Sequence, residues 1–230
     1  MSDVDRDAER VITQVVAERH PDARILGEEF SPSERIGDGL IFVADPLDGT
    51  TNFLHGFPWY AVSIAAVDRG EIAAGVILNA ANGELFTATA GGGARLNGQP
   101  IRVSSIAEPG RALIGTGFPF KDPRDIDEYL RMLPPLMRDI AGIRRPGSAA
   151  LDLADVACGR FEAFWELTLS PWDIAAGLLL VREAGGIVTD RNGAPCQIAR
   201  TSVVAGNPAM HSWLLKIVQG NTGGDANPSP

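Results

Sequence analysis

The stretch from residue 40 to residue 53, LIFVADPLDGTTNF, limits the possible folds more than any other part of the chain. It begins with an apolar run, Leu40 to Ala44, of the kind that forms a buried strand. Two aspartates, Asp45 and Asp48, follow directly and lie on either side of Pro46. Charged side chains at the end of a buried strand need partners that the strand cannot supply. The sequence therefore predicts a buried strand whose acidic end binds something that neutralises it.

The composition narrows the class of protein. The 230 residues are 45% hydrophobic and 21% charged, which is ordinary for one or two globular domains in water. The formal net charge of -9 argues against a nucleic acid or an anionic membrane as the main partner. The first residues contain no apolar signal core, and no apolar run reaches the ~18 residues that span a bilayer. We therefore expect a cytoplasmic protein.

Cysteine usage gives no sign of a disulfide framework or a zinc site. The chain has two cysteines, Cys158 and Cys196, and neither belongs to a CxxC motif. Both are expected to be reduced thiols packed in the protein.

The apolar pattern predicts a first half, residues 1–140, that mixes helices with an antiparallel sheet. Apolar residues at helical spacing with acids in the first turn predict a helix over 3–19. A short strand then ends at Glu28 and Glu29. Apolar runs separated by the turns DRGE and ANGE predict an antiparallel meander over 60–103. A helix follows over 126–141, with a break expected at Pro134 and Pro135.

The second half, residues 141–219, is predicted to alternate helices and strands. A helix begins after the candidate N-cap Ser148. The later elements are strands over 161–167, 187–190 and 202–206 and helices over 172–186 and 209–218. The tail, 220–230, lacks apolar anchors and is expected to be disordered.

The pair Asp45 and Asp48 can be read in two ways. An aspartate before proline or glycine is commonly a turn former. Here, however, Pro46 fixes the backbone, so that both carboxylates and the carbonyl of Leu47 can turn toward one point. Hard cations such as Mg²⁺ prefer an oxygen-only set of this kind. Gly49 follows, and its backbone N–H can approach an anion closely, so a metal and a phosphate can lie side by side.

Two further acidic sites can complete a metal centre. Glu28 and Glu29 end a strand that can lie beside the strand ending at Asp45, although a GEE sequence alone is commonly a solvated loop. Asp173 follows Pro171 and Trp172 at a helix start, where an aspartate often caps the helix. The capping and metal-binding roles of Asp173 are compatible.

Together these residues resemble the inositol monophosphatase family of Mg²⁺-dependent, lithium-sensitive sugar-phosphate phosphatases. The resemblance rests on GEE at 27–29, DPLDGTTNF at 45–53 and WDIAAG at 172–177, and it extends from about Ser2 to Gln219. It implies an α+β or α/β fold, the layered αβαβα sandwich of the inositol monophosphatase and fructose-1,6-bisphosphatase type. It also implies a homodimer. The chain is expected to depart from the family in one respect, the missing first N-terminal helix, since Met1 directly precedes the segment SDVD.

The resemblance assigns the metal ligands and the groups that act on water. Glu28, Asp45 and the carbonyl of Leu47 match the ligands of a first Mg²⁺ ion. Asp45, Asp48 and Asp173 match those of a second, and the family uses two or three ions in all. Glu28 also matches the residue that helps to hold the attacking water.

The resemblance also assigns the groups that contact the phosphate and the alcohol. Gly49 and Thr50 match the amides that bind the phosphate, and the Thr50 hydroxyl matches the group that orients the water. Asp5 matches the acid that hydrogen-bonds this threonine. Contacts with the alcohol part of the substrate are implied for four residues: Ser148, Ala149, Glu166 and Asp173.

The predicted activity is Mg²⁺-dependent hydrolysis of a small polyol phosphate monoester, foremost myo-inositol monophosphate, by direct in-line attack of water. The enzyme would then be an inositol-phosphate phosphatase, a phosphoric monoester hydrolase. Fructose-1,6-bisphosphatase, histidinol-phosphatase and nucleotide 3'-phosphatase activities stay open, because one fold hosts several substrates. A different class, a regulatory protein that binds the transcription machinery, is the other hypothesis. The acidic composition gives that hypothesis no basic surface for RNA.

Overall fold

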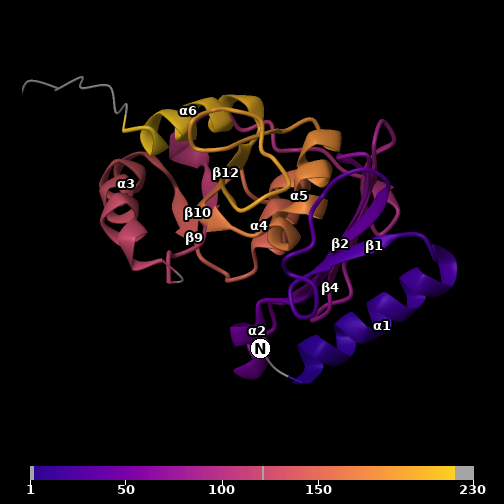
Figure 1. Cartoon of the computed structure of the whole chain (residues 1–230). Helices are drawn as coiled ribbons and strands as arrows, with labels where there is room; N and C mark the ends of the chain where they lie inside the picture. Colours follow the sequence, from indigo (N-terminus) through magenta and orange to yellow (C-terminus); the bar gives the residue numbers. More distant parts are fainter. Residues whose placement is uncertain (1–2, 121, 221–230) are drawn as a thin grey trace, which may run out of the picture.

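The computed structural model describes residues 3–120 and 122–220, and its first half forms a seven-stranded sheet (Figure 1). The strands lie side by side in chain order, and β1 and β2 are parallel while all later neighbours are antiparallel. The predicted meander is therefore confirmed. The strands are β1 (Arg24–Gly27), β2 (Leu40–Asp48), β3 (Ala61–Asp68), β4 (Glu71–Asn79), β5 (Leu85–Thr89), β6 (Gly93–Leu96) and β7 (Gln99–Pro100).

The second sheet has five strands and draws on both halves of the chain. Its order is β11-β12-β10-β8-β9, so β8, which comes early in the sequence, lies between β10 and β9. The strands are β8 (Leu113–Thr116), β9 (Gly142–Arg144), β10 (Ala163–Leu169), β11 (Ile187–Thr189) and β12 (Thr201–Gly206). The change from the first sheet to the second thus falls between residues 100 and 113. The division of the chain at residue 140 stays a prediction.

Helices separate and cover the two sheets (Figure 1). Helix α1 packs on the outer side of the first sheet, against β2, while α4 and α5 lie between the sheets and α3 and α6 pack together on the far side of the second. This order gives five layers, so the predicted αβαβα sandwich is confirmed. The helices are α1 (Asp3–Arg19), α2 (Thr50–Leu54), α3 (Ile126–Asp139), α4 (Ala149–Ala157), α5 (Pro171–Glu183) and α6 (Pro208–Val218), with 3₁₀ turns η1 (Pro109–Arg111) and η2 (Pro123–Asp125).

The central layer is the most deeply buried part of the molecule. Every residue of α4 is buried, and so are nine consecutive residues of α5, from Asp173 to Val181. Helix α5 approaches strand β4 so closely that a Cβ on Gly75 would lie 3.0 Å from the Cα of Ala176. A glycine on the strand is what permits this contact between the two layers.

The expected break at Pro134 and Pro135 is wrong, because α3 continues from Ile126 to Asp139. Each proline lacks the N–H that would pair with the carbonyl four residues earlier, at Leu130 and Arg131. Both of these residues are exposed, so water can serve their carbonyls. The helix also buries Tyr129, Met132 and Leu136 on its other face, and that packing stabilises it despite the prolines.

Some sequence predictions concern features outside these layers. Most of the tail expected to be disordered, residues 221–230, lies outside the described residues. Cys158 and Cys196 are free thiols. Within residues 3–120 and 122–220, no helix is both long enough and apolar enough to cross a membrane.

Candidate active site

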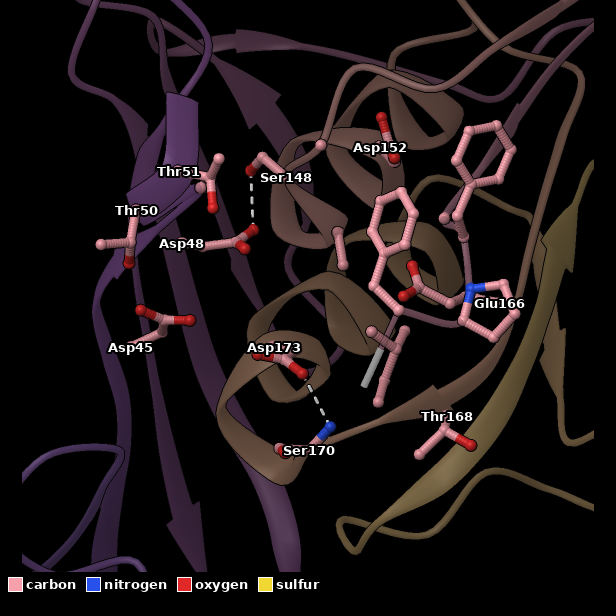
Figure 2. A pocket seen from close by; sticks show the side chains of 18 of the residues that line it. Asp45, Asp48, Thr50, Thr51, Ser148, Asp152, Glu166, Thr168, Ser170 and Asp173 are labelled. Atoms are coloured by element: carbon pink, nitrogen blue, oxygen red, sulfur yellow. Dashed lines mark hydrogen bonds between the residues drawn. The ribbon is translucent and has the colours of Figure 1, made fainter. Parts of the chain in front are cut away.

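A pocket of about 460 Å³ opens where the carboxyl ends of β1 and β2 face the first turns of α4 and α5 (Figure 2). It is lined by all but one of the residues that the sequence nominated: Glu28, Asp45, Leu47, Asp48, Gly49, Thr50, Ser148, Ala149, Glu166 and Asp173. The exception is Asp5, which lies behind the pocket wall in contact with Thr50. Segments that are far apart in the chain thus meet at one place.

Asp45 and Asp48 share one side of β2 because the strand is irregular between them. In a regular strand, residues three apart point to opposite faces. The pairing of β2 with β3 shifts between Asp45 and Asp48, at the point where Pro46 can donate no ladder hydrogen bond. Carboxylate oxygens of Asp45, Asp48 and Asp173 consequently lie within 4.8 Å of one another.

Asp45 is the buried member of this group. Only 1% of its surface is exposed, and its Oδ1 accepts a hydrogen bond of 2.9 Å from the N–H of Leu47. Burial raises the pKa of Asp45 well above its ordinary value, and the carboxylates of Asp48, Glu28 and Asp173 raise it further. A cation among these groups would remove the repulsion that they exert on one another.

Glu28 reaches the group from the neighbouring strand. Because β1 and β2 are parallel, with Gly27 opposite Ala44, Glu28 follows its strand beside Asp45. The turn that carries it is held by Glu9 of α1, a fully buried carboxylate that accepts the N–H groups of Glu29 at 2.8 Å and Phe30 at 3.0 Å. The Glu9 carboxyl occupies the space that a Cβ on residue 27 would need. Sequence reasoning missed Glu9, although its acidic side chain falls on the buried face of α1.

Gly49 and Thr50 form the turn between β2 and α2. Two features require a glycine at position 49. Its φ of 95° is unfavourable for other residues, and a Cβ there would lie 2.9 Å from the carbonyl oxygen of Trp59. The Thr50 Oγ1 lies 3.2 Å from Asp5 Oδ1 and 3.1 Å from the carbonyl oxygen of Leu47. The structure thus brings Asp5 against Thr50.

Helix α4 is attached to Asp48. Ser148, its N-cap, donates its hydroxyl to Asp48 Oδ2 at 2.6 Å, and the N–H of Ala150 donates to the same oxygen at 2.7 Å. The hydroxyl of Ser148 is therefore already engaged with an acidic residue of the site. Its expected contact with the alcohol stays a prediction, as does that of Ala149, which lines the pocket beside it.

Asp173 performs the structural role that its position at a helix start suggested. It lies in the first turn of α5, where its Oδ2 accepts the N–H of Ser170 at 2.7 Å. The same carboxylate belongs to the group with Asp45 and Asp48. This arrangement fixes the side chain against the backbone while presenting it to the pocket.

Glu166 lies on the side of the pocket away from the three aspartates (Figure 2). Its carboxyl group packs against Gly117, where a Cβ would collide with it. Next to this end of the pocket, the guanidinium of Arg145 packs against the rings of Phe118 and Phe120, 5.5 and 5.2 Å from the ring centroids. The far end of the pocket is therefore both acidic and aromatic.

Asp152 also lines the pocket, although no sequence motif pointed to it. Only 1% of it is exposed, and its Oδ1 has no hydrogen-bond partner among the described residues. Burial raises the pKa of Asp152 well above its ordinary value, with Glu166 and Asp48 adding to the effect. Asp152 lies four residues after Ser148, on the same face of the helix, and this spacing could have predicted that it faces the site.

The donor set fits a hard divalent cation. Carboxylate oxygens from Glu28, Asp45, Asp48 and Asp173 and the carbonyl of Leu47 are oxygen ligands of the kind that Mg²⁺ prefers. Burial, and after it the repulsion from neighbouring carboxylates, raises the pKa of Asp45, and a bound cation would offset both effects.

A five-layered αβαβα fold with such an oxygen-donor site at the ends of its strands defines a class of metal-dependent phosphatases. The chain belongs to the inositol monophosphatase family, whose model matches residues 1–222. Membership of this family makes it a phosphatase by classification. Some of its relatives are named inositol-1-monophosphatase and others Nus factor SuhB.

The chain is 47% identical to the Nus factor SuhB of Pseudomonas aeruginosa over 223 residues, which cover 95% of this chain and 82% of that protein. It is 45% identical to the inositol-1-monophosphatase of Rhizobium meliloti over 219 residues, again 95% of this chain and 82% of the relative. The crystal structure of the extragenic suppressor protein suhB from Bartonella henselae superposes with a TM-score of 0.90 at 44% identity, covering 95% of this chain and 84% of that one.

Proposed function

We propose that this protein hydrolyses the phosphate monoester of a small polyol, myo-inositol monophosphate, by direct attack of water. The observation that carries the proposal is the meeting of Asp45, Asp48 and Asp173 within 4.8 Å, in the same pocket as Gly49, Thr50 and Glu166. One pocket thus offers a place for a cation, a phosphate and a hydroxyl-bearing alcohol. The name of the Rhizobium meliloti relative supports the choice of substrate.

The metal ligands proposed are Glu28, Asp45, the Leu47 carbonyl, Asp48 and Asp173, holding two or three Mg²⁺ ions. When bound, Mg²⁺ would supply charge neutralisation at the phosphate and a lowered pKa for water. Asp45 is buried and Asp48 is held by α4, so these side chains need little rearrangement on binding. Preorganisation of this kind is what makes electrostatic stabilisation effective.

The attacking water would be held by Glu28 and Thr50. The Thr50 hydroxyl has two possible acceptors, Asp5 Oδ1 and the Leu47 carbonyl, and donation to either leaves lone pairs on Oγ1 that would accept a hydrogen from water. Gly49 and Thr50 would offer backbone N–H groups to the phosphate oxygens. At the far end of the pocket, Glu166 would accept hydrogen bonds from hydroxyls of the alcohol.

A phosphate-release panel tests this proposal. The substrates are inositol 1-phosphate, fructose 1,6-bisphosphate, histidinol phosphate and adenosine 3',5'-bisphosphate, each with Mg²⁺ and with Mg²⁺ removed by a chelator. We expect the highest kcat/KM for inositol 1-phosphate and no turnover without Mg²⁺. A higher kcat/KM for another ester would change the assigned substrate, and metal-independent turnover would contradict the proposed site.

A second candidate function is a regulatory role in transcription. It is favoured by the name Nus factor SuhB of the Pseudomonas aeruginosa relative, which is 47% identical. Co-purification of RNA polymerase with the wild-type protein and with the variant Asp48→Asn tests this role. Binding that survives the loss of catalysis would support it, and the absence of polymerase from both samples would contradict it.

A further inference from the structure

Asp152 is the one side chain in the pocket whose buried oxygen lacks a partner among the described residues. Its exposed fraction is 1%, and its Oδ1 is shielded from bulk water by the surrounding protein. Leaving a buried acceptor unpaired is unfavourable, so such atoms in native proteins usually have a specific reason to exist. Since Asp152 lines the pocket, a ligand in the pocket can approach its carboxyl group and supply the hydrogen bond that the protein does not.

A second buried aspartate on the same helix, Asp155, does have a charged partner and can be compared with Asp152. Asp155, three residues after Asp152, is also buried, with 3% exposed. Its Oδ1 is 3.1 Å from Nη1 of Arg160, and it does not line the pocket. The protein therefore provides a cation for the acid that lies outside the pocket lining. Arg145, the cation that acts on Asp152, packs instead against Phe118 and Phe120.

The position of Asp152 along α4 is fixed relative to the acidic group. The first turn of α4 is tied to Asp48 by Ser148 and Ala150, at 2.6 and 2.7 Å. Asp152 lies one turn further along, about 6 Å by the rise of an α-helix. Figure 2 shows Asp152 and Glu166 on the side of the pocket away from Asp45. A substrate whose phosphate lies near Asp45 and Asp48 would thus extend its alcohol toward Asp152 and Glu166.

We propose that Asp152 is a specificity-determining residue, whose carboxyl group pairs with a hydroxyl of the alcohol part of the substrate. The inference rests on the proposed polyol phosphatase function and adds a second acidic contact to that of Glu166. A hydroxyl can donate to a carboxylate and can accept from a carboxylic acid, so the pairing holds in either protonation state of Asp152. An ester without hydroxyls gains nothing from it.

The test compares two substrates in wild-type protein and in Asp152→Leu, a replacement of similar size without polar atoms. The substrates are inositol 1-phosphate and p-nitrophenyl phosphate, whose leaving group has no aliphatic hydroxyl. We expect kcat/KM for inositol 1-phosphate to fall about 10-fold or more, mainly through KM, because a pairing to the substrate is lost. For p-nitrophenyl phosphate we expect a change below about 2-fold. The unfolding midpoint should stay the same or rise, since an unpaired buried acceptor has been removed.

Two further variants keep the test decisive. Asp152→Asn retains one acceptor oxygen in the same shape, so it should lose less activity toward inositol 1-phosphate than Asp152→Leu, and it replaces the latter if that variant does not fold. Asp155→Asn is the matched control outside the pocket and should leave the ratio between the two substrates unchanged. Calorimetric titration of free myo-inositol, with Mg²⁺ and inorganic phosphate present, gives a second readout: binding should weaken in Asp152→Leu.

The outcomes separate this inference from the function on which it rests. Equal losses on both substrates, or no loss on either, would overturn the role of Asp152 while leaving the phosphatase function in place. Wild-type protein that hydrolyses p-nitrophenyl phosphate but neither hydrolyses inositol 1-phosphate nor binds myo-inositol would overturn the proposed substrate, and the role of Asp152 with it.

Discussion

The two walls of the pocket differ in how their acidic groups are stabilised. The strand wall, made of Glu28, Asp45, Leu47, Asp48 and Thr50, comes from adjacent strand ends and is held by short contacts to backbone and hydroxyl groups. The helix wall, made of Ser148, Asp152 and Glu166, comes from α4 and β10, and one of its buried oxygens has no partner among the residues that the structure describes. This difference fits the proposed function, in which the strand wall holds the metal ions and the attacking water and the helix wall contacts the alcohol part of the substrate.

The largest effect is expected on the strand wall, from Asp48→Asn. The change removes a negative charge from the three-aspartate group while preserving the shape that α4 contacts. We expect kcat to fall about 1000-fold at saturating Mg²⁺, because the charge that positions the cation is lost. Phosphate release and circular dichroism check activity and fold together. Asp68→Asn, at the far end of the β2–β3 pair, is the matched control, and near-normal turnover by a folded Asp48→Asn protein would remove Asp48 from the metal site.

The next effect concerns the Thr50 hydroxyl. Thr50→Ala removes the oxygen that contacts Asp5 and the Leu47 carbonyl, so we expect about a 100-fold lower kcat that added Mg²⁺ does not restore. Thr50→Ser keeps the hydroxyl and should recover most of the activity. Full recovery of Thr50→Ala by metal would mean that this residue acts on the metal and not on the water.

On the helix wall, Glu166→Gln should change substrate preference more than catalysis. Glutamine has the same size and still fits over Gly117, but it replaces one acceptor oxygen by a donor. We expect about a 10-fold loss of kcat/KM for inositol 1-phosphate and little change for p-nitrophenyl phosphate. Equal losses of activity on both esters would show that Glu166, on the helix wall, does not act mainly on the choice of substrate.

A smaller effect is expected from Glu9, which supports the strand wall from behind. Glu9→Gln keeps only one acceptor for the two N–H groups of Glu29 and Phe30, so the turn carrying Glu28 should loosen. Because outer partners of metal ligands tune affinity, we expect about a 10-fold higher Mg²⁺ concentration for half-maximal activity, with a similar weakening in a calorimetric Mg²⁺ titration. An unchanged Mg²⁺ affinity together with a lower unfolding midpoint would restrict Glu9 to the stability of the fold.

The smallest effect on activity is expected from Asp155→Asn, outside both walls. Burial outweighs the nearby Arg160 and raises the pKa of Asp155 to about 6 from its ordinary 3.8. The folded protein therefore binds more protons than the unfolded chain between about pH 4 and 6, and this carboxyl makes the free energy of unfolding fall as the pH rises through that window, by about 3 kcal/mol in total. Denaturant unfolding of wild type and variant from pH 4 to 7 measures the difference. Parallel pH profiles would show that the pKa of Asp155 is not raised.

How far the sequence predicted this molecule depended on whether the deciding contacts were local. The N-cap Ser148 and the meander of hairpins follow from short patterns, and the structure has both. The buried strand that begins at Leu40 is also present, but it continues past Asp45 to Asp48. The break expected at the two prolines of α3 was wrong, because packing of Tyr129 and Leu136 against the second sheet outweighs the lost backbone hydrogen bonds. Local propensity could not include that packing.

The site shows the same limit. Asp45, Asp48 and Thr50 could be nominated because they lie within six residues of one another in one motif. Glu9 and Asp152 each sit inside a helix, where an acidic residue usually faces solvent, and only the tertiary structure shows that both are buried. The spacing from Ser148 could indicate on which face of the helix Asp152 lies. It could not show that Oδ1 has no partner within residues 3–120 and 122–220, because that depends on where Arg145 and Glu166 lie.

The attachment of α4 to Asp48 has a consequence for folding. Asp48 ends a strand of the first sheet, while Ser148 and Ala150 lie at the start of a helix a hundred residues later. A proposed metal ligand therefore also connects early and late parts of the chain. An ion that binds only when this contact is closed contributes its binding free energy to the assembly of the whole sandwich. The cation concentration would then affect two quantities: how often the contact between Asp48 and helix α4 opens, and the rate at which the phosphate is cleaved.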